Sequence, residues 1–530
     1  MNLRFTDADH ARMQRMGITA DSVIDQIGML RRSDYFVRLN RPCTLFDGIR
    51  KISDADLEKY MGLHALASAK GRFTKFVPAS GAATRMFQSL LNIFYLPQYL
   101  EKDELHKRVN QGVSIACDFN QFVDKLERFP FAAALRKAMA CDGHNLETVV
   151  QSGRFRLLLE YLLTERGINY GNLPKAMLLF HSYPGEIRTA FEEQLRDSLE
   201  YLGVDRPGVH FTISEDHQTG FLTLEGQVRR RWAKRCGATF EASFSFQKSS
   251  TNTIAMDMKG MPFRDRLGRL LFRPAGHGAL IENLRDLEAD LIYIKNVDNV
   301  VPDRLKGPVH FWKKALGGCL VSIENSVHSL LRRLSGPDWG PAVRDASQFC
   351  SSELLVNFPA PFPTWPEDQK RSFLLDTLNR PIRVCGMVPN SGEPGGAPFW
   401  VEDEKGGLSL QIVEKPQVDL NSPKQSTVWN ASTHFNPVDI VCSVRDFEGK
   451  PFDLKKFVDP EAVIITRKSI DGTDLHALEL PGLWNGAMAR WITVFIEVPQ
   501  TTFNPVKSIF DLLRPEHQPE DLAPALTAGQ

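Results

Sequence analysis

The sequence predicts an α/β fold built on one mixed sheet. Short apolar runs with the length and composition of strands recur along the chain, separated by stretches with helical periodicity, as in strands joined by crossover helices. With 530 residues, of which 42% are hydrophobic and 24% charged, the chain can bury a large core. We therefore expect a globular protein with two or three subdomains around a single sheet.

Residues 1–70 are expected to form a helical N-terminal cap. Apolar residues recur at helical spacing in SVIDQIGML and LEKYMGLHAL, and the pattern breaks near RPCTLFDGI. The first strong strand, FTKFVPAS, then turns through Gly81 into the helical pattern TRMFQSLLNIF. A strand, a tight loop and a helix in this order are typical of a phosphate-binding βα unit.

The rest of the chain is predicted to form two halves. Residues 71–358 make an α/β half, with a helical insertion at about 103–166. Residues 359–368 are rich in proline and aromatic residues and are expected to connect this half to a β-rich half, 359–530. The predicted strands after the insertion are KAMLLFHS, VHFTIS, FEASFSFQ, DLIYIKNVD, IRVCGMV, LSLQIVE, VDIVCSV, VIITR and ITVFIEVP.

Composition and charge argue against several classes of function. Lysine plus arginine and aspartate plus glutamate number 64 each, so no global positive field favours nucleic acid as a partner. No window reaches the ~18 apolar residues of a membrane span, and residues 1–17 lack an apolar signal core. The eight cysteines show no zinc-site spacing, and we expect them to be reduced in a cytoplasmic protein.

The most informative segment is 272–299, where FRPAGHGALIENL precedes the apolar run LIYIKNVDN. Gly276 and Gly278 flank His277, and glycines let a backbone approach a ligand closely. Asp298 ends the apolar run and would present a carboxylate at the carboxyl end of a strand. A nucleotide-binding loop beside a metal-binding acid is the simplest interpretation; a structural imidazole and a helix cap or Asx turn are the alternatives.

VPASGAATRMF, at residues 77–87, resembles the signature loop of the nucleotidyltransferases that make nucleotide sugars, whose pattern is roughly two glycines, any residue, Gly, Thr and Arg. Gly81, Thr84 and Arg85 match, whereas Ser80 and Ala83 replace glycines and make the loop bulkier. The alternative is a turn of small residues that packs a helix on a strand. The resemblance implies a nucleotide-binding loop formed by Ser80, Gly81, Ala82 and Thr84.

LPKAMLLFHSYPGEIRTAFEEQLRDSL, at residues 173–199, resembles the next segment of that superfamily, in which a Pro-Lys pair precedes an apolar strand and a helix. The resemblance makes Lys175 the phosphate-binding lysine. An ammonium group beside oxyanions suits phosphoryl chemistry, which needs positive charge where negative charge develops. A lysine that extends from a strand edge into solvent would have the same sequence pattern.

PAGHGALIENL resembles the PPGHGD-type loop of eukaryotic UDP-sugar pyrophosphorylases, and NVDN resembles their Asn-x-Asp-Asn metal motif. The resemblance implies that Gly276, His277 and Gly278 contact the nucleotide. Asp298 would hold Mg²⁺, for which one or two acids plus substrate phosphates suffice. Gln247 falls where those enzymes place a glutamine that reads the base, and its amide can both donate to and accept from uracil.

VPQTTFNPVKSIFDLLRP, at residues 498–515, resembles the VPRxxFxPVKxxxDLL segment of eukaryotic UDP-glucose pyrophosphorylases. Lys507 matches their second functional lysine and would neutralise the attacking sugar phosphate and the α-phosphate. GEPGGAPFW, LSLQIVE and STHFNPVDIV resemble segments that contact the sugar in the same family. They place Gly395, Gly396, Glu414 and Asn436 near sugar hydroxyls, although polar strand ends occur around any α/β site.

The whole chain, including ALELPGLWNGAMARW, is similar to a bacterial domain-of-unknown-function family, family 4301, which shares the signature of the UDP-sugar pyrophosphorylase and nucleotide-diphospho-sugar transferase superfamily. The resemblance implies a Rossmann-like mixed sheet of the nucleotide-diphospho-sugar transferase type. Residues 71–358 would bind the nucleotide, and residues 359–530 would bind the sugar and end in the C-terminal lysine segment. The β-helix domain of the eukaryotic enzymes is absent from the sequence, so any oligomer is expected to assemble differently.

The leading hypothesis is a magnesium-dependent sugar-1-phosphate nucleotidylyltransferase. A sugar 1-phosphate would attack the α-phosphorus of a nucleoside triphosphate, UTP being favoured, and pyrophosphate would leave. Arg85 and Lys175 would stabilise the leaving group and Lys507 the approaching phosphate, and no general base is needed because a phosphate monoester is already anionic. A glycosyltransferase on the same fold and a non-catalytic nucleotide-sugar-binding protein are the alternatives.

Overall fold

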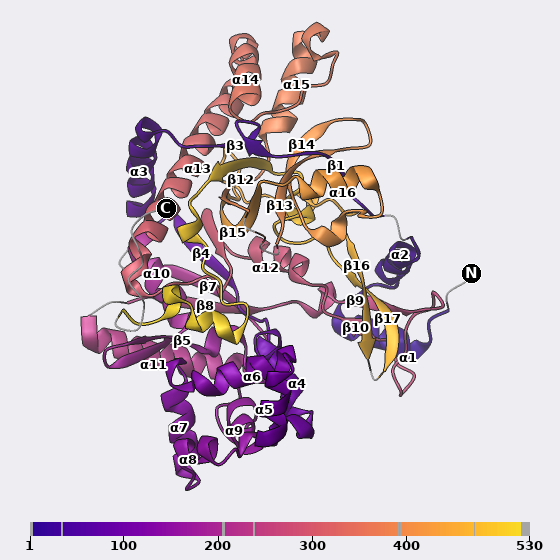
Figure 1. Ribbon diagram of the computed structural model, residues 1–530. Coiled ribbons are helices and arrows are strands. Elements are labelled where there is room, and N and C mark those ends of the chain that lie inside the picture. The colour runs from indigo at the N-terminus through magenta and orange to yellow at the C-terminus, as the bar shows by residue number, and fades with distance from the viewer. Residues whose placement is uncertain are drawn as a thin grey trace.

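A mixed β-sheet forms the centre of the molecule (Figure 1). The computed structural model describes residues 4–32, 35–203, 207–236, 239–390, 392, 395–470 and 472–520. Within these residues, β15 is antiparallel to both of its neighbours and every other neighbouring pair of the sheet is parallel, which confirms the predicted mixed α/β fold. In spatial order the strands are β2 (Thr44–Leu45), β3 (Gly48–Arg50), β18 (Ile492–Glu497), β12 (Ile382–Pro389), β15 (His434–Ser443), β11 (Leu291–Lys295), β4 (Phe73–Pro78), β7 (Gly208–Ile213) and β8 (Glu241–Phe246).

Every apolar run that predicted a strand forms one, but three of the runs belong to smaller sheets. A sequence pattern identifies a strand but not its partner, because pairing also depends on register and on the connecting turns. The smaller sheets are β1 (Arg38–Pro42) with β13 (Ala397–Glu402) and β14 (Leu408–Val413); β10 (Phe272–Arg273) with β9 (Thr253–Asp257), β17 (Thr473–Glu479) and β16 (Ile464–Ile470); and β5 (Leu179–Tyr183) with β6 (Glu186–Thr189).

The segment predicted as an N-terminal cap is shared between several parts of the fold. The helices α1 (Asp7–Met16) and α2 (Ala20–Arg31) pack against the sheet that contains β9, and α3 (Asp54–Ala69) packs elsewhere, on α13. The stretch RPCTLFDGI, where the helical pattern breaks, contributes to β1, β2 and β3. These strands are too short to produce an alternating pattern in the sequence, so only the helices were predicted.

Helices cover both faces of the central sheet. On one face lie α3, α13 (Lys306–Ser335), α14 (Gly340–Ser352) and α15 (Glu367–Leu378). A side chain at Gly318 of α13 would collide with the main chain of Tyr60 on α3, so this glycine allows the two helices to approach closely. The other face is covered by α12 (Ile281–Arg285) and by residues 454–458 and 483–491.

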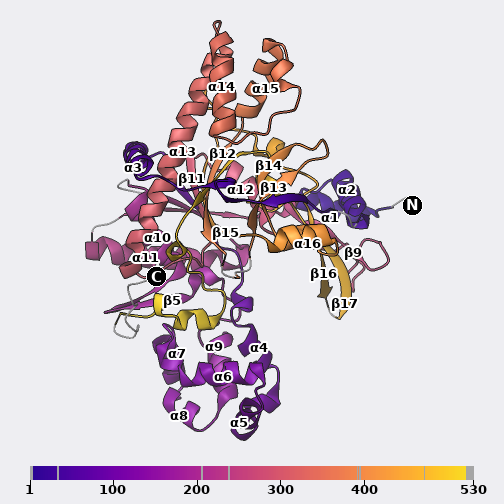
Figure 2. The same ribbon diagram turned by 45° about the horizontal axis from the view of Figure 1, so that its top comes forward.

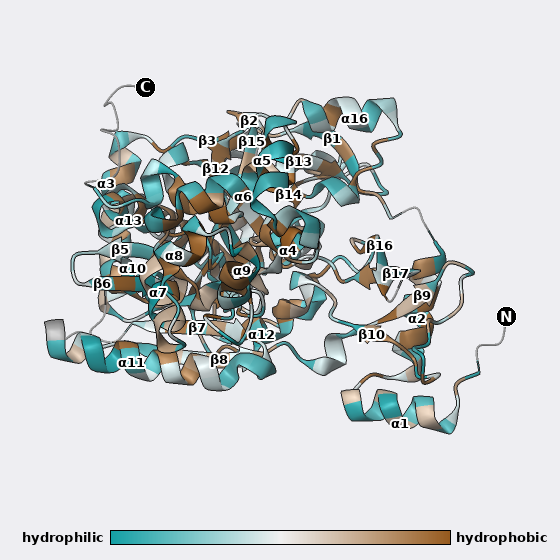
Figure 3. Ribbon diagram, turned by 60° about the horizontal axis from the view of Figure 1, so that its bottom comes forward, coloured by the Kyte–Doolittle hydropathy of each residue, from teal (hydrophilic) through white to brown (hydrophobic). Residues whose placement is uncertain are grey.

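The helical insertion forms a separate layer beside the sheet, at the bottom of Figure 2. Hydrophobic positions of α4 and α9 gather at its centre, whereas α11 (Gln218–Cys236) is mostly hydrophilic (Figure 3). The last described residues pack on this layer, because Arg128 Nε donates to Gln518 Oε1 at 3.1 Å and Gln518 Nε2 donates to Arg128 O at 3.2 Å. The layer also includes α4 (Gln88–Phe94), which precedes the predicted insertion. The helices of the insertion are α5 (Lys102–Asn110), α6 (Ser114–Asp124), α7 (Ala132–Cys141), α8 (Leu146–Gln151) and α9 (Phe155–Leu163).

Two helices complete the fold. α10 (Ala190–Tyr201) packs against α13 and β7, and α16 (Pro423–Asn430) packs against β1. The cysteine side chains that the structure describes are free thiols, and Cys236 lies outside this set. No helix in the described part of the chain is long and apolar enough to cross a membrane.

Candidate functional site

The loops that carry most of the predicted site residues meet at one edge of the central sheet. All strands except β15 point in the same direction, so the carboxyl ends of β11, β4, β7 and β8 lie side by side. Residues 79–85 follow β4, residues 296–299 follow β11, and Gln247 follows β8. Ligands of open α/β sheets bind outside the carboxyl ends of their strands, so this edge is the candidate site.

Two lysines from distant segments converge on Asp298. Lys175 Nζ lies 2.9 Å from Asp298 Oδ2 and also donates to the main-chain oxygen of Val506 at 2.9 Å. Lys507 Nζ lies 3.3 Å from the same carboxylate oxygen. The side chain of Lys175 is 15% exposed and that of Lys507 is 49% exposed, so the cluster opens to solvent on the side of Lys507. The structure thus brings together three charged groups that separate motifs had indicated.

One oxygen of the Asp298 carboxylate is left without a partner. Burial alone would raise the pKa of Asp298, but the ammonium groups of Lys507 and Lys175 outweigh burial and hold this pKa below its ordinary value. Oδ2 accepts from both lysines, whereas Oδ1 is buried and has no hydrogen-bond partner among the described residues. An unpaired buried carboxylate oxygen is unfavourable, and a hard divalent cation is a suitable partner for it. Asp298 therefore fits the single protein ligand that Mg²⁺ would need beside substrate phosphates.

The loop after β4 lies directly against the segment that carries Lys175. The main-chain N–H of Lys175 donates to Gly81 O at 3.3 Å, and that of Ala83 donates to Leu173 O at 3.1 Å. Ala83 is fully buried, whereas a side chain at Gly81 would meet no atom within 4 Å. Packing therefore explains the small residue at position 83 but not the glycine at position 81, whose main chain is open to a ligand.

The helix after this loop begins later than the sequence suggested. The stretch TRMFQSLLNIF was expected to be helical from its start, but Ala83–Arg85 form a single 3-10 turn and α4 begins at Gln88. The loop has no α-helix terminus directly behind it, so loop amides and Arg85 are the groups available to an anion. Ser80 is half-buried, and the exposed residues are Gly81, Ala82, Thr84 and Arg85.

The glycines on either side of His277 have a structural reason. A side chain at Gly278 would collide with the main-chain oxygens of Leu480 and Pro481, so another part of the chain requires glycine there. Gly276 has a φ of 74°, in the left-handed region that favours glycine. The sequence interpretation assigned both glycines to close approach of a nucleotide. The structure shows a packing reason for Gly278 and a conformational reason for Gly276, and the contact with a nucleotide stays a prediction.

His277 borders one of the predicted sugar residues. Its Nδ1 accepts from the main-chain N–H of Leu483 at 3.0 Å, and its ring stacks on Trp484 with the centroids 4.1 Å apart. Trp484 Nε1 donates to Glu414 Oε1 at 3.1 Å, and His277 Nε2 lies 3.7 Å from the same oxygen. Burial lowers the pKa of His277 despite the nearby carboxylates, so the ring is neutral at pH 7 and Nδ1 can accept.

Gly395, Gly396, Glu414 and Asn436 form one neighbourhood, as the motifs implied. The main-chain N–H of Asn436 donates to Gly396 O at 2.7 Å, a side chain at Gly396 would lie 3.3 Å from Glu414 Cγ, and one at Gly395 would lie 3.9 Å from Asn436 O. Asn436 Oδ1 accepts from the main-chain N–H of Val438 at 3.1 Å. Asn436 Nδ2 is buried and has no partner in the described part of the chain, which leaves one amide donor for a ligand.

The sheet order places Asp298 between the predicted sugar and nucleotide residues. β15, which carries Asn436, neighbours β11 on one side. β4, β7 and β8, which precede the Gly81 loop and Gln247, lie on the other side. Gln247 Nε2 is buried and lacks a partner among the described residues, so it too can donate to a ligand.

A sequence-family profile described as Domain of unknown function (DUF4301) matches residues 6–518. The chain belongs to this family. Membership confirms the family that the sequence motifs indicated, and it covers both predicted halves of the chain. Among curated proteins, none matches this DUF4301 sequence.

Several solved structures can be aligned with this DUF4301 chain. The uridine diphosphate N-acetylglucosamine pyrophosphorylase from Trypanosoma brucei, in complex with an inhibitor, is 12% identical over 96% of this chain and 79% of its own, with a TM-score of 0.49. A UDP-glucose pyrophosphorylase mutant from Leishmania major with UDP-glucose is 12% identical over 96% and 79%, with a TM-score of 0.42. A UDP-glucose phosphorylase from Trypanosoma brucei is 12% identical over 96% and 77%, with a TM-score of 0.42. Identities this low transfer no activity, so function has to be argued from the side chains of the site.

Gln194, which no motif indicated, supports the turn that carries Asp298. Its side chain is fully buried, and Nε2 donates to the main-chain oxygens of Asn296 at 2.9 Å and Val297 at 3.2 Å. In the sequence, Gln194 stands in the polar helical stretch FEEQLRDSL, which is typical of a solvated helix. Only the packing of α10 under the sheet reveals that this amide faces inward.

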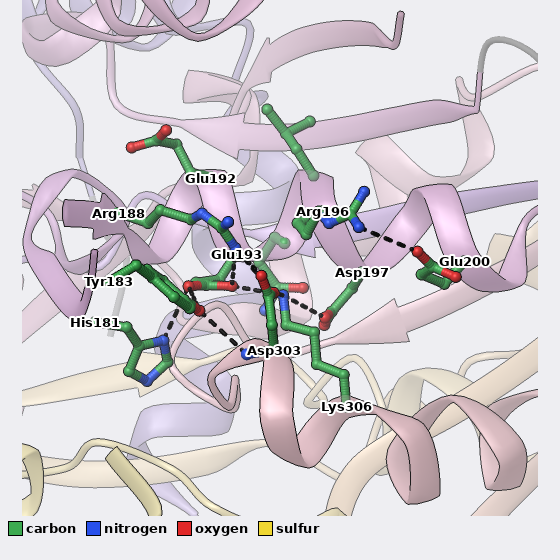
Figure 4. Close-up of polar contacts among 12 residues, drawn as sticks. His181, Tyr183, Arg188, Glu192, Glu193, Arg196, Asp197, Glu200, Asp303 and Lys306 are labelled. Carbon is green, nitrogen blue, oxygen red and sulfur yellow. Dashed lines mark hydrogen bonds and ion pairs between the residues drawn. The ribbon is translucent and has the colours of Figure 1, made fainter. Parts of the chain in front are cut away.

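A buried ionic network lies beside this turn (Figure 4). Lys306, at the start of α13, has its Nζ 2.5 Å from Glu193 Oε2 and 3.3 Å from Asp197 Oδ1, both on α10. Asp197 Oδ2 lies 3.5 Å from Nζ of Lys295 on β11 and 3.9 Å from Nζ of Lys75 on β4. The two strands that precede the candidate-site loops are thus tied to α10 and α13 through one carboxylate.

Because of this network, we expect the free energy of unfolding of the protein to decrease in acid. Burial alone would raise the pKa of Glu193, but Lys306 and the hydrogen-bonded His181 lower it to about 2. Because the folded-state pKa is depressed, the stabilisation is complete above the unfolded value near 4.5 and is lost as the pH falls from there toward 2, an effect on the order of 3 kcal/mol. We expect the difference in free energy of unfolding between wild type and Glu193→Gln, measured by urea denaturation, to narrow across this range.

The matched control for this measurement is Glu200→Gln on the same helix. Glu200 forms an exposed ion pair with Arg196, 3.4 Å apart. Its replacement is expected to change the free energy of unfolding by about 1 kcal/mol or less at every pH. A difference between wild type and Glu193→Gln that stays constant from pH 5 to pH 2 would contradict the prediction.

A cavity of about 850 Å³ lies at the opposite edge of the sheet. Ile492 and Thr493, the first residues of β18, line it together with Phe358 and Phe373. It therefore opens at the amino ends of the strands, away from Asp298. Cavity volume alone does not identify the candidate site in this molecule.

Proposed function

We propose that this protein is a sugar-1-phosphate nucleotidylyltransferase, which transfers a nucleotidyl group from a nucleoside triphosphate to a sugar 1-phosphate and releases pyrophosphate. One observation carries the proposal: Lys175 and Lys507 both contact Oδ2 of Asp298, at 2.9 and 3.3 Å, while Oδ1 has no partner among the described residues. Two cations and one acid with a free oxygen match the needs of a reaction in which two phosphate anions must meet.

The proposed roles follow from the position of each group. Lys175 lies against the Gly81 loop and, with Arg85, would stabilise the charge on the leaving pyrophosphate. Lys507, the more exposed of the two lysines, would neutralise the incoming sugar phosphate and bring it in line with the α-phosphorus. The nucleophile is already an anion at neutral pH, so the side chains position and neutralise but do not remove a proton.

Magnesium is the proposed cofactor, and Asp298 Oδ1 is the oxygen that would bind it. When bound, the ion would neutralise charge on the phosphates of the triphosphate. Lys175 and Lys507 already compensate the charge of Asp298 in the absence of substrate. We expect triphosphate oxygens to take over these two ammonium groups, which would free the carboxylate for the metal.

The preference for UTP and the sugar contacts rest on two buried amide donors. Gln247 Nε2 and Asn436 Nδ2 lack partners among the described residues, and a buried unpaired donor is unfavourable until a ligand satisfies it. Gln247 would donate to a carbonyl oxygen of uracil, and Asn436 to a sugar hydroxyl, with Glu414 accepting from another hydroxyl. His277 would act mainly through its contacts with Trp484 and Glu414.

A substrate screen tests the proposal. The purified protein is incubated with magnesium, each common nucleoside triphosphate and a panel of sugar 1-phosphates, and phosphate is measured after addition of pyrophosphatase. We expect release only when a triphosphate and a sugar 1-phosphate are both present, with UTP giving the highest rate.

Other outcomes of the screen would replace the proposal. Consumption of a nucleotide sugar only in the presence of a sugar acceptor, without pyrophosphate, would identify a glycosyltransferase. Binding of nucleotide sugars without turnover in any combination would identify a non-catalytic binding protein. Mixing order, metal and pH are varied before turnover is judged absent.

A further inference from the structure

The segment that carries Lys507 is held against the turn that carries Asp298. The main-chain N–H of Val506 donates to Asp298 O at 3.1 Å, and Asn299 and Pro505 form an antiparallel bridge. Lys507 is the next residue along the segment. The main chain on both sides of the contact between Lys507 and Asp298 is therefore fixed by the same short pairing.

The side chain of Asn299 adds two bonds to this pairing. Its Oδ1 accepts from the main-chain N–H of Asn504 at 2.9 Å, and its Nδ2 donates to the main-chain oxygen of Thr502 at 3.4 Å. Asn299 is 2% exposed, so these bonds form away from water. The side-chain amide of Asn299 thus bonds to the main chain of the C-terminal segment at two residues, Thr502 and Asn504, shortly before Lys507.

We propose that Asn299 is a positioning residue for Lys507: its amide holds the C-terminal segment in the register that brings the lysine to Asp298. The inference rests on the proposed function in one respect, that Lys507 meets a polyphosphate. Asn299 itself directs both polar side-chain atoms to the main chain of this segment. It follows Asp298 directly in the chain, so a single turn presents the acid and also fixes the lysine that faces it.

The side chain of Lys507 has few contacts of its own, so its position depends on how the main chain is held. Besides the pairing with Asn299, the Lys507 N–H donates to Asp511 Oδ2 at 2.8 Å and Lys175 Nζ donates to Val506 O at 2.9 Å. The side chain of Lys507 is 49% exposed. Among the described residues, its Nζ forms one ion pair, with Asp298 at 3.3 Å. A long lysine side chain loses rotamer freedom when it is ordered. Fixing its main chain in advance reduces this entropic penalty and keeps the ammonium group near the place where a phosphate would bind.

A double-mutant cycle on polyphosphate binding tests the inference without relying on turnover. Binding of inorganic tripolyphosphate with magnesium is measured by calorimetry for wild type, Asn299→Ala, Lys507→Ala and the double variant. We expect the dissociation constant to rise about 5-fold in Asn299→Ala and about 10-fold in Lys507→Ala. The double variant should have the same dissociation constant as Lys507→Ala alone. A residue that acts only through Lys507 has nothing further to lose once the lysine is gone.

Asn504→Ala is the matched control. The bond to Asn299 uses the main chain of Asn504. This variant therefore removes a buried side-chain amide from the same segment and keeps both hydrogen bonds of Asn299. It is expected to bind tripolyphosphate within about 2-fold of wild type. Should Asn299→Ala fail to fold, as judged by circular dichroism, Asn299→Ser replaces it, because serine is too short to reach both main-chain groups.

Each outcome decides the matter. Additive losses for Asn299→Ala and Lys507→Ala, or wild-type binding by Asn299→Ala, would overturn the positioning role. Absence of tripolyphosphate binding in wild type would overturn both this inference and the proposed function. Coupled losses in binding together with a negative substrate screen would leave the positioning role standing and remove only the enzymatic proposal.

Discussion

Replacing Asp298 with alanine is expected to abolish nucleotidyl transfer while the protein stays folded. The variant removes the carboxylate that faces both lysines and the only oxygen proposed for magnesium, so two ammonium groups would repel each other and the metal would lose its ligand. Loss of one preorganised electrostatic group in an active site lowers kcat by about 10²–10³-fold, and Asp298 combines two such roles. The coupled pyrophosphate assay, run beside thermal unfolding, measures both parts of this expectation.

Three further variants make the prediction specific. Asp298→Asn keeps the shape of the side chain and loses its charge, and should be as inactive as Asp298→Ala. Lys175→Ala should also abolish turnover, because Lys175 lies between Asp298 and the main chain of Val506. Asp345→Ala on α14, which breaks an exposed ion pair with Arg333 on α13, is the control and should retain the wild-type rate. Wild-type rates in both Asp298→Ala and Lys175→Ala would remove the assignment.

The charged cluster could be anticipated because Asp298 follows an apolar run, while the segments of Lys175 and Lys507 resemble segments of nucleotide-sugar pyrophosphorylases. Lys175 precedes an apolar strand, Asp298 follows one, and Lys507 lies in a segment with a specific spacing of proline, valine and aspartate. Parallel strands bring their carboxyl ends to one edge, so a polar residue just after such a strand is readily placed. The structure brings these three groups together, and their catalytic roles stay a prediction until the variants are measured.

Residues that act on the main chain could not be anticipated. Asn299 and Gln194 bond to backbone oxygens and N–H groups of segments far away in the chain, and no spacing in the sequence records such a partner. The glycines around His277 illustrate the same limit. Their sequence pattern indicates close approach of another group, and at Gly278 the main chain of Leu480 and Pro481 is such a group.

Strand pairing shows the corresponding limit for the fold. The long apolar runs predicted the strands themselves, because a buried parallel strand needs side chains that are apolar on both faces. The strands β2 and β3 are too short to stand out, yet they extend the central sheet beyond β18. β3 pairs with β18, whose sequence lies more than four hundred residues away, and β2 pairs with β3.

Asp197→Asn is expected to destabilise the protein more than any other single substitution considered above. Asp197 is buried, and its two oxygens lie within 4 Å of Lys75, Lys295, Lys306 and His310. Burial alone would raise its pKa, but Lys306, Lys295 and Lys75 hold this pKa well below the ordinary value, so the carboxylate is ionised in the folded protein. Burial also lowers the pKa values of Lys295 and Lys75, so the positive charge of these two lysines depends on this carboxylate. Removing one partner of a buried ionic group typically costs about 3–5 kcal/mol, because the remaining charges stay desolvated without compensation.

The control is Asp303→Asn, which changes the same network at its solvent-exposed end. Asp303 contacts Lys306 at 3.2 Å and Arg188 at 2.8 Å, but its side chain is 40% exposed, so water can replace the lost interactions. The free energy of unfolding of the Asp303→Asn variant should be lower than that of wild type by about 1 kcal/mol or less. Both variants are compared by urea denaturation with two optical probes.

Asp197 also ties β4 and β11 to α10, so Asp197→Asn should make the loops that follow these strands less ordered and should weaken tripolyphosphate binding. Equal losses of stability in the two variants would show that burial of the network contributes nothing.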